Sequence, residues 1–329
     1  MKFSIIVPVY NRPDEVDELL QSLCMQTVKD FEVLIVEDGS IKTCKDVCDK
    51  YADILVLHYY AKENSGPGQS RNYGAERAKG EYLLILDSDV VLPTDYLTAI
   101  DQLLSAYPTE AFGGPDAAHP SFTPVQKAIS YSMTSFFTTG GIRGGKAKLD
   151  KFYPRSFNMG IRRDVYQKLG GFTKMRFGED IDFSYRIVEA GYRPQLFTEA
   201  WVWHKRRTDF RKFFRQVYNS GIARINLEKR HPGTMKIVHL LPTVFTIGTF
   251  ALILAALISP IALVPIILYS ILILIDSSIY NKSLWVGLLS IPAAFVQLTG
   301  YGLGFIESWW KRCVLKKDEF QAFEKTFYK

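Results

Sequence analysis

The stretch "YLLILDSDVVLP", residues 82–93, joins a short apolar run to two aspartates. Tyr82 and the apolar residues 83–86 predict a strand that is buried on both faces. Asp87 and Asp89 follow directly, with one serine between them. Like charges this close repel one another, so the pair needs a partner that neutralises both carboxylates. The stretch therefore predicts a ligand site where a buried strand ends.

Helical patterns alternate with apolar strands on both sides of this stretch. We expect strands at 3–10, 31–40, 54–60 and 81–89, and helices at 13–26 and 68–80. The alternation predicts an α/β fold, Rossmann-like, with a mostly parallel sheet and helices on both faces. Ligands of such sheets bind beyond the carboxyl ends of the strands.

Polar residues collect at these predicted strand ends. The first strand ends at Pro8, Tyr10 and Asn11, the second at Glu37 and Asp38, and the fourth at Asp87 and Asp89. Taken alone, Asp38 fits a turn and Asn11 fits a helix cap. Two carboxylates at i and i+2 can hold a hard divalent cation that keeps positions open for substrate phosphates. The sequence thus predicts Mn²⁺ or Mg²⁺ at Asp87 and Asp89, with a nucleotide diphosphate as the ligand.

The C-terminal part of the chain is strongly apolar. No Asp, Glu, Lys or Arg occurs between residues 237 and 275, and apolar runs cover 238–259, 261–275 and 284–306. A membrane-spanning helix needs about 20 apolar residues, so the first and third runs qualify and the second is short. We expect a membrane domain here rather than the buried core of a soluble protein. Gly300 and Gly304 have the G-x-x-x-G spacing that lets helices approach closely, although glycines are common in such helices without this role.

Basic residues flank the apolar region on both sides. They are Arg224, Lys229, Arg230 and Lys236 before it, and Lys311, Arg312, Lys316 and Lys317 after it. Both groups favour the cytoplasmic side, which three spans do not allow. Either one run is re-entrant or interfacial, or the charge rule fails at one end. We expect a cytoplasmic domain over 1–230, since no export segment precedes its first strand, two or three transmembrane helices over 231–310, and a basic tail over 311–329.

The remaining composition excludes other classes of protein. The net charge of +6 is explained partly by contact with anionic lipid at the membrane and partly by the basic cluster 205–207. No nucleic-acid-binding module is apparent in the sequence, so we expect no nucleic-acid partner. The cysteines are Cys24, Cys44, Cys48 and Cys313. They lack C-x-x-C spacing, which favours free thiols in a reducing compartment over a zinc site.

Five segments of the chain resemble the inverting family 2 glycosyltransferases with the GT-A fold. They are "SIIVPVYNRPDEVDELLQSLCMQ", "EVLIVEDGS", "GPGQSRNYGAERAKGEYLLILDSDV", "FNMGIRRDVYQKLGGF" and "FGEDIDFSYRIVEAGYRP". Their order and spacing over about residues 3–220 make the set specific, and the apolar tail is similar to bacterial members that build cell-surface polysaccharides or glycolipids. The resemblance implies metal-dependent transfer of a hexosyl group. The donor would be a nucleotide-sugar, and the acceptor a lipid-linked glycan or glycolipid at the cell membrane.

The resemblance also implies roles for single residues. Donor binding falls to Pro8, Tyr10, Asp38, Arg71 and Asp87, the acceptor pocket to Asn158 and Glu179, and the metal to Asp87, Asp89 and His204. Asp180 in "GED" is the implied general base for the acceptor hydroxyl. Two alternatives stay open: Glu179, Asp180 and Asp182 also fit the acidic first turn of a helix, and His204 also fits a structural histidine.

One motif departs from the family pattern. Processive members carry Gln-x-x-Arg-Trp before their membrane helices, whereas this chain has Gln216 followed by Tyr218 and Asn219. We therefore expect a single-addition enzyme, with a processive polysaccharide synthase as the alternative. A sugar-nucleotide pyrophosphorylase would carry a glycine- and basic-rich loop after its first strand, which is missing here. Intact Asp87, Asp89 and Asp180 argue against a non-catalytic membrane scaffold with a degenerate transferase domain.

Overall fold

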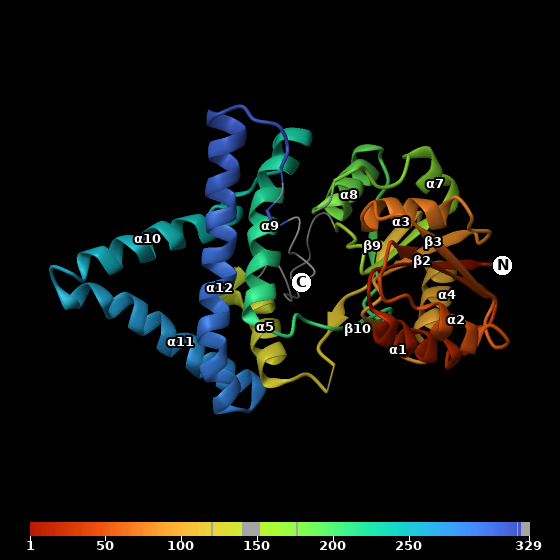
Figure 1. The fold of residues 1–329 in the computed structure, drawn as a ribbon, viewed down its shortest axis with the longest axis horizontal. Coiled ribbons are helices and arrows are strands. Elements are labelled where there is room, and N and C mark those ends of the chain that lie inside the picture. Colours follow the sequence, from red (N-terminus) through yellow and green to blue (C-terminus); the bar gives the residue numbers. More distant parts are fainter. Residues whose placement is uncertain (120, 140–151, 176, 321, 324–329) are drawn as a thin grey trace. The chain divides into compact units, whose positions relative to one another are not determined.

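The computed structural model describes residues 1–119, 121–139, 152–175, 177–320 and 322–323 (Figure 1). The chain packs into two compact units. Unit 1 contains Met1–His119 and Leu149–Lys205, and unit 2 contains Pro120–Lys148 and Arg206–Lys329. Unit 2 therefore contains a segment from the middle of the sequence as well as the C-terminal part. The expected division was a single boundary at residue 230.

Unit 1 is built on a seven-stranded sheet of order β3-β2-β1-β4-β8-β6-β9. The strands are β1 Phe3–Val9, β2 Phe31–Asp38, β3 Leu57–Lys62, β4 Tyr82–Leu86, β6 Ala111–Gly113, β8 Asn158–Arg162 and β9 Gln195–Leu196. β1 to β4 are parallel, and β8 runs antiparallel to both β4 and β6. The expected α/β class with a mostly parallel sheet is confirmed.

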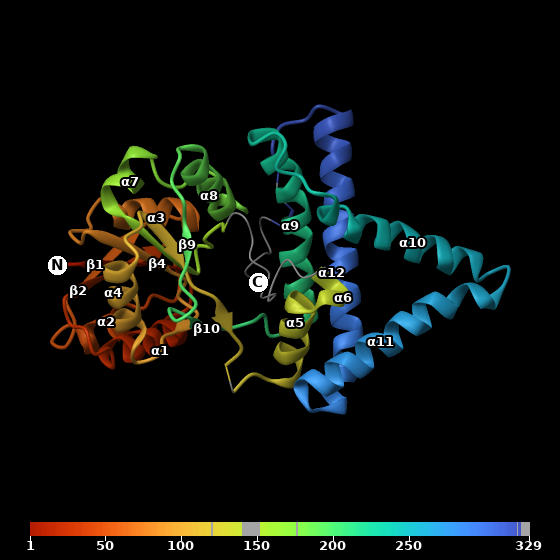
Figure 2. The ribbon, with the colours of Figure 1, turned by 180° about the vertical axis from the view of Figure 1, so that it is seen from behind.

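Helices cover both faces of this sheet (Figure 2). One face carries α1 Pro13–Cys24, α2 Lys45–Tyr51 and α4 Tyr96–Ala106, and the other carries α3 Pro67–Ala75, α7 Arg163–Lys168 and α8 Glu179–Glu189. Successive strand residues alternate between the two cores: Leu84 packs with the first set and Leu83 with the second. Because both faces are buried, the strands read as continuous apolar runs.

Several element boundaries differ from the sequence expectation. β3 begins at Leu57 rather than at 54, and β4 ends at Leu86, so Asp87 and Asp89 lie in the following turn. α3 ends at Ala75, and Gly80 does not close it. A Cβ atom on Gly80 would lie 2.6 Å from the backbone nitrogen of Ser4. Gly80 is therefore required by the close approach of the chain to β1.

A second, three-stranded sheet lies at the end of β4. It pairs β5 Val90–Val91, β10 Val202–His204 and β7 Asp116–Ala117 in the order β5-β10-β7. β10 runs antiparallel to β5, with His204 opposite Val90. This pairing brings a residue from late in the sequence beside the turn that holds Asp89.

Unit 2 is helical. Its helices are α5 Pro124–Thr134, α6 Phe136–Thr139, α9 Phe210–Arg230, α10 Leu241–Ala255, α11 Val264–Asn281 and α12 Leu284–Trp309, with short 3₁₀ or π turns at Ile237–His239 (η1), Pro260–Leu263 (η2) and Trp310–Val314 (η3). Among the described residues, three segments are long and apolar enough to cross a membrane: Ile237–Ala255, Pro260–Asn281 and Leu284–Val314. The second has 22 residues, longer than the apolar run 261–275, because the helix continues through Asp276.

Glycines set the close packing of α12. A Cβ atom on Gly300 would lie 2.6 Å from Val217 Cγ2, and one on Gly304 would lie 2.0 Å from the carbonyl oxygen of Tyr218, both in α9. On another face of α12, a Cβ atom on Gly302 would lie 2.2 Å from Thr246 Oγ1 in α10. The G-x-x-x-G spacing therefore does serve close helix approach here.

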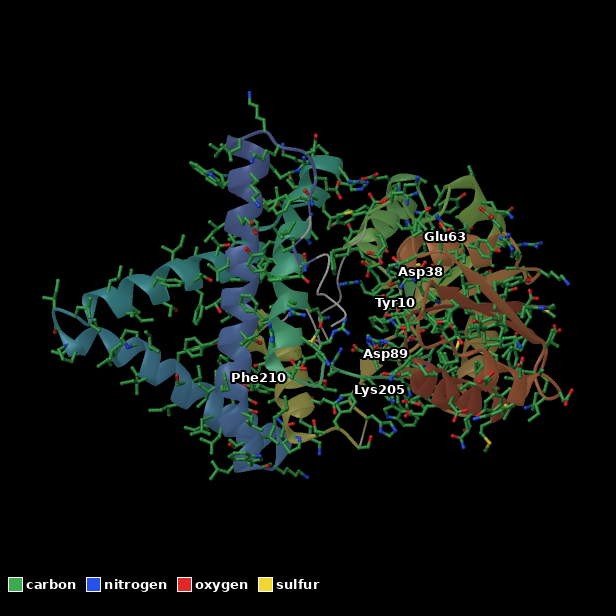
Figure 3. All side chains as sticks on the ribbon, viewed as in Figure 1. Tyr10, Asp38, Glu63, Asp89, Lys205 and Phe210 are labelled. Atoms are coloured by element: carbon green, nitrogen blue, oxygen red, sulfur yellow. The ribbon has the colours of Figure 1, made fainter. Side chains whose placement is uncertain are left out.

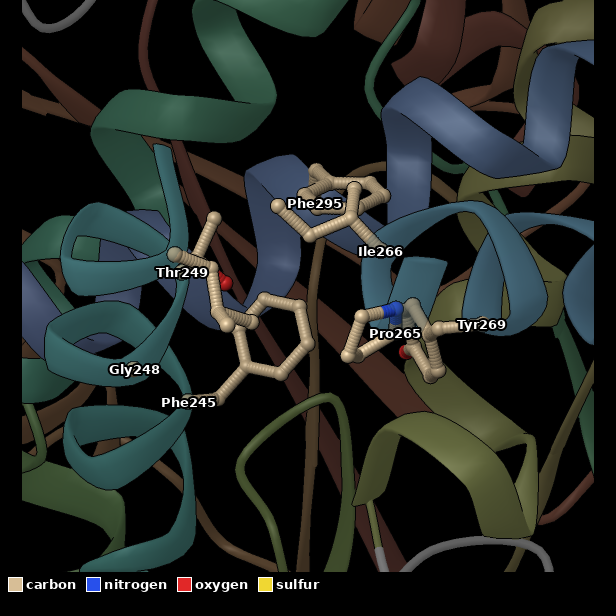
Figure 4. A pocket seen from close by; sticks show the side chains of 8 residues that line it. Phe245, Gly248, Thr249, Pro265, Ile266, Tyr269 and Phe295 are labelled. Atoms are coloured by element: carbon tan, nitrogen blue, oxygen red, sulfur yellow. The ribbon is translucent and has the colours of Figure 1, made fainter. Parts of the chain in front are cut away.

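An apolar pocket of about 220 Å³ lies in unit 2 where α10, α11 and α12 meet (Figure 4). Its lining comprises Phe245, Gly248, Thr249, Leu252, Pro265, Ile266, Tyr269 and Phe295. The rings of Phe245, Tyr269 and Phe295 pack on one another with centroids 5.2 to 5.8 Å apart. The lining carries no carboxylate or basic group, so this pocket is not the site that the strand ends predict.

Candidate active site

The carboxyl ends of β1, β2 and β4 bring the predicted polar residues to one edge of unit 1. Figure 3 shows Asp38, Tyr10 and Asp89 in succession along this edge. β1 lies between β2 and β4 in the sheet, so the strand order reverses beside it. Crevices at such a reversal are the usual ligand sites of open α/β sheets.

Asp87, Asp89 and His204 come together at the end of β4. One ligand atom from each lies within 4.8 Å of the others. His204 Nε2 is 3.2 Å from Asp89 Oδ1 and 3.9 Å from Asp87 Oδ2. Two carboxylates and one imidazole, partly open to solvent, are a donor set that suits Mn²⁺, and the two carboxylates without the imidazole also suit Mg²⁺. The structure therefore brings together the three residues named above as metal ligands.

Further groups hold the His204 ring in place. The ring stacks on Phe157 with centroids 4.9 Å apart, and Nδ1 lies 3.8 Å from Asp116 Oδ2. Burial would lower the pKa of His204, but the carboxylates of Asp89 and Asp116 outweigh it and raise the pKa to about 9. A carboxylate on the far nitrogen of a ligating histidine orients the ring, as in many metal sites.

Two arginines neutralise the aspartate pair. Arg12 Nη1 donates to Asp89 Oδ2 at 2.5 Å, and Arg71 Nη2 donates to Asp87 Oδ1 at 2.8 Å. Arg71 is 3% exposed and also donates to Glu179 Oε1 at 2.9 Å. Its guanidinium thus links Asp87, a predicted metal ligand, to Glu179, a predicted acceptor residue. The sequence had assigned Arg71 to donor binding only.

Glu179 and Asp180 open helix α8. Gly178 precedes them with φ 85°, a left-handed conformation that favours glycine and starts the helix. Burial raises the pKa of Glu179 to about 7, against the opposing charge of Arg71. Burial would also raise the pKa of Asp180, but Arg155, whose Nε is 2.5 Å from Asp180 Oδ2, holds it below its usual value. The two neighbouring acids therefore differ in proton affinity.

Asp38 is buried at the end of β2. Its two oxygens accept hydrogen bonds from the backbone nitrogens of Ser65 and Gly66, each at 2.9 Å, and Lys62 pairs with Oδ1. The carboxylate therefore organises the loop that leads from β3 into α3. Oδ1 accepts from both Ser65 and Lys62, and Oδ2 accepts from Gly66.

The other predicted residues differ in exposure. Pro8 lies inside β1, opposite Val36, and Tyr10 is the first residue beyond that strand; both are half-buried. Asn158, at the start of β8, is 1% exposed. Its Oδ1 accepts from the Tyr96 hydroxyl, and its Nδ2 donates to the Ala200 carbonyl, each at 2.7 Å. This network sits in the core, so the predicted contact of Asn158 with a substrate stays a prediction.

Sequence reasoning missed four charged residues of the site: Arg12, Lys62, Asp116 and Arg155. Arg12 had a usable signal, because it follows the polar end of the first strand and the aspartate pair needs a counter-charge. The other three had none, since no residue near them in the sequence identifies the carboxylate or imidazole that each one meets.

The match to a known family decides the class of protein. Residues 4–170 match the family model described as "Glycosyl transferase family 2". The chain belongs to this family. The resemblance drawn from its motifs is confirmed, and so is the fold class.

Two curated relatives illustrate the range of the family. The family 2 chain is 31% identical over 199 residues to an uncharacterized glycosyltransferase of Haemophilus influenzae, which covers 60% of this chain and 65% of the relative. It is 41% identical over 93 residues to the poly(ribitol-phosphate) beta-N-acetylglucosaminyltransferase TarS of Staphylococcus aureus, covering 27% of this chain and 16% of TarS. The chain thus spans less than two thirds of the length of either relative.

Solved structures show the same fold. The mannosyltransferase PcManGT from Pyrobaculum calidifontis, in complex with GDP-Man and Mn²⁺, has a TM-score of 0.67 at 18% identity, covering 94% of this chain and 88% of that one. Residues 1–349 of S. aureus TarS give a TM-score of 0.51 at 21% identity, covering 75% and 70%. At these identities the likeness concerns the fold alone.

Proposed function

We propose that the family 2 chain is an inverting hexosyltransferase that moves a sugar from a nucleotide-diphosphate sugar to a membrane-associated acceptor. The observation that carries the proposal is the Asp87, Asp89 and His204 group at the end of β4 in a chain of this family. The solved neighbours support the donor class, since one holds GDP-Man with Mn²⁺ and TarS has been solved with UDP-GlcNAc.

Asp87, Asp89 and His204 would hold the divalent cation, Mn²⁺ or Mg²⁺. When bound, this ion supplies positive charge that stabilises the leaving diphosphate. Around it, Pro8, Tyr10 and Asp38 would bind the base and ribose. Arg71 and Arg12 lie on the two metal carboxylates, where their charges also favour an anionic donor.

Asp180 is the proposed general base. It would accept the proton of the acceptor hydroxyl as that oxygen attacks the anomeric carbon from the face opposite the diphosphate. Arg155 keeps Asp180 ionised. Glu179, bound to Arg71, would orient the acceptor, with Asn158 farther into the pocket wall. Glu179 is the alternative base, because a pKa of about 7 suits proton transfer near neutral pH.

The acceptor is proposed to be a lipid-linked glycan or glycolipid in cell-surface polysaccharide synthesis. The three apolar helical segments support a place at the cell membrane, in contact with lipid. We place the catalytic unit on the cytoplasmic side of that membrane. The absent Arg-Trp pair after Gln216 favours a single addition over processive synthesis.

A donor panel tests the proposal. The purified full chain is incubated with UDP-, GDP- and dTDP-sugars and a membrane lipid extract, with Mn²⁺ or with excess EDTA. We expect one nucleotide class to be consumed with Mn²⁺ and to be left intact with EDTA, with one sugar added per acceptor. Consumption of no nucleotide-sugar under any condition would contradict the transferase assignment, and a ladder of long products would contradict single addition.

Membrane location gives a separate prediction. The apolar faces of α10 and α11 are largely exposed, and burying them in lipid is strongly favourable. We expect the full chain to stay in the membrane fraction after washing with alkaline carbonate, which strips peripheral proteins. A cytoplasmic marker protein of the host serves as the control for release. Recovery of the chain in the wash without detergent would contradict the membrane assignment.

A further inference from the structure

α12 packs lengthwise on α9. Residues later in α9 contact residues later in α12. Near the start of α9, Phe210 shares an apolar cluster with Leu289, and in its middle Val217 faces Gly300. Towards its end, the Ile222 carbonyl accepts a hydrogen bond from Ser308, and the Asn226 side chain accepts one from Arg312. The last two hydrogen bonds measure 3.2 and 3.0 Å. The helices therefore lie side by side and parallel over nearly the whole of α9 (Figure 1).

α9 carries too many charged side chains to lie in the hydrocarbon core of a bilayer. Its charged residues are Arg211, Lys212, Arg215, Arg224, Glu228, Lys229 and Arg230, distributed from its first turn to its last. Both flanking segments, 206–209 and 231–236, are polar as well. α9 must therefore stay outside the bilayer core, and so must any helix that follows it along its length.

α5 reinforces this side of α12. Ala128 of α5 packs with Val286 and Ala293, and Tyr131 packs with Ala294 of α12 and Ile273 of α11. α5 begins at a polar capping box and carries lysine and glutamine in its first turns. α9 and α5 thus both pack along α12.

α10 and α11 stand on α12 at two separate places. The base of α10 meets α12 at Gly302, against Thr246, and the base of α11 meets it where Ser277 and Ser290 share a hydrogen bond of 2.6 Å. From these points the helices converge as a V, which both views show (Figures 1 and 2).

The tip of this V is apolar and highly exposed. Leu257, Ile258 and Ile261 are 83%, 92% and 77% exposed, and residues 255–264 contain no charged side chain. Exposure of this apolar surface to water is unfavourable, whereas contact with lipid chains is favourable. The apolar pocket of Figure 4 opens between the two arms.

We propose that α12 lies along the membrane surface, between α9 on its aqueous side and the lipid, and that α10 and α11 form a hairpin that penetrates the bilayer from that side and returns to it. The partner of this surface is the lipid bilayer. Of the three segments long enough to cross, the third then does not cross. The inference rests on the proposed membrane location and specifies its topology.

This arrangement removes the conflict between the flanking charges. Lys236 before the hairpin, Lys282 after it, and Lys311 and Arg312 at the end of α12 all lie on the cytoplasmic side. Trp285, Trp309 and Trp310 are about half exposed at the two ends of α12. At the depth of the headgroups, where tryptophan is preferred, an in-plane helix accommodates all three.

Cys313 provides a native reporter for the test, because it is exposed at the end of α12 whereas Cys44 and Cys48 are buried. The full chain with Cys24→Ser is produced in a bacterial host, and spheroplasts are treated with a membrane-impermeant maleimide before and after permeabilisation. We expect Cys313 to be labelled only after permeabilisation. Labelling of Cys313 in intact spheroplasts would overturn the proposal, since a crossing α12 places it outside.

Two matched variants complete the test, each made with Cys24→Ser and Cys313→Ser. Ile41→Cys, at a site 91% exposed in unit 1, marks the side of the catalytic unit and should behave as Cys313 does. Ile258→Cys marks the hairpin tip. Labelling of Ile258→Cys that appears only after permeabilisation, to the level of Ile41→Cys, would place the tip on the cytoplasmic side and overturn the hairpin. If Cys313 reacts under neither condition, Lys317→Cys replaces it as the reporter.

The carbonate wash is needed beside the labelling, because a chain that never reached a membrane would also show Cys313 labelled only after permeabilisation. Release by carbonate would refute the membrane location itself. Retention together with outside labelling of Cys313 would refute only the in-plane helix.

Discussion

Replacing Asp89 by alanine is expected to reduce sugar transfer by roughly 10³-fold or more, because the substitution removes one of three groups that would hold the cation on the diphosphate. Asp89 lies in a turn, and its side chain is 14% exposed beside Arg12. Its loss leaves that arginine near solvent rather than deep in the core. We therefore expect a folded, inactive protein. Transfer is measured with saturating donor and Mn²⁺, and folding by thermal unfolding.

Asp164→Ala is the matched control. Asp164 also pairs with an arginine, Arg162, but it is a surface acid at the start of α7, 65% exposed and outside the site. This variant should transfer sugar at the normal rate. Excess EDTA should inactivate the parent chain to the level of Asp89→Ala, and Mn²⁺ should restore only the parent. Full activity in EDTA would show that the reaction needs no divalent cation.

Replacing Asp180 by asparagine is expected to lower kcat by roughly 10² to 10⁴-fold, the usual contribution of a general base. The amide keeps the shape of the carboxylate and removes its proton affinity. Donor binding should change little, because the proposed donor contacts come from Asp38, Asp87 and Asp89. Calorimetry with the nucleotide-sugar and product release under single-turnover conditions separate the two effects.

Glu179→Gln is the comparison that assigns the base. If Asp180 is the base, this variant loses much less activity than Asp180→Asn. The pH profile of the parent gives a second criterion. Because the pKa of Asp180 lies below its usual value, kcat should be flat from pH 6 to 8 and fall only in acid. A base with the pKa of Glu179, about 7, would make kcat rise across that range.

Opposite results have definite meanings. An active Asp180→Asn beside an inactive Glu179→Gln would exchange the two roles. If both variants are active, the acidic first turn of α8 serves the helix and the base lies elsewhere.

The sheet could be predicted because its strands are buried on both faces. Apolar runs such as 83–86 and turn residues after them are local signals, and they located β1, β2 and β4 to within two or three residues at each end. The two aspartates Asp87 and Asp89 could be recognised as one site for the same reason, since they are two residues apart in the sequence. His204 was suggested only by family resemblance, since it reaches the pair through β10, whose partner β5 is far away in the sequence.

Apolar counting alone did not determine how unit 2 is built. It located α10, α11 and α12, but the boundary of the second run was set too early at residue 275, since Asp276 is accommodated by the Tyr131 hydroxyl, 2.5 Å away. Nothing local in the sequence of α5 shows that its partners lie in α11 and α12. Such long-range pairing depends on tertiary packing, which periodicity does not report.

The discontinuous composition of the two units has a consequence for synthesis on the ribosome. α5 emerges well before the helices that cover it, so its apolar side, with Ala128, Ile129 and Tyr131, has no partner until α9 and then α11 and α12 have been made. The folding of unit 1 is also delayed, because its strand β8 and helix α8 are synthesised after the α5 segment. A shortened chain ending at residue 230 would keep α9 against Ile129 but would leave Ala128 and Tyr131 without their partners in α11 and α12, and such exposed apolar surface promotes aggregation. The nascent protein is thus expected to need the membrane, or a chaperone, until its last helix is complete.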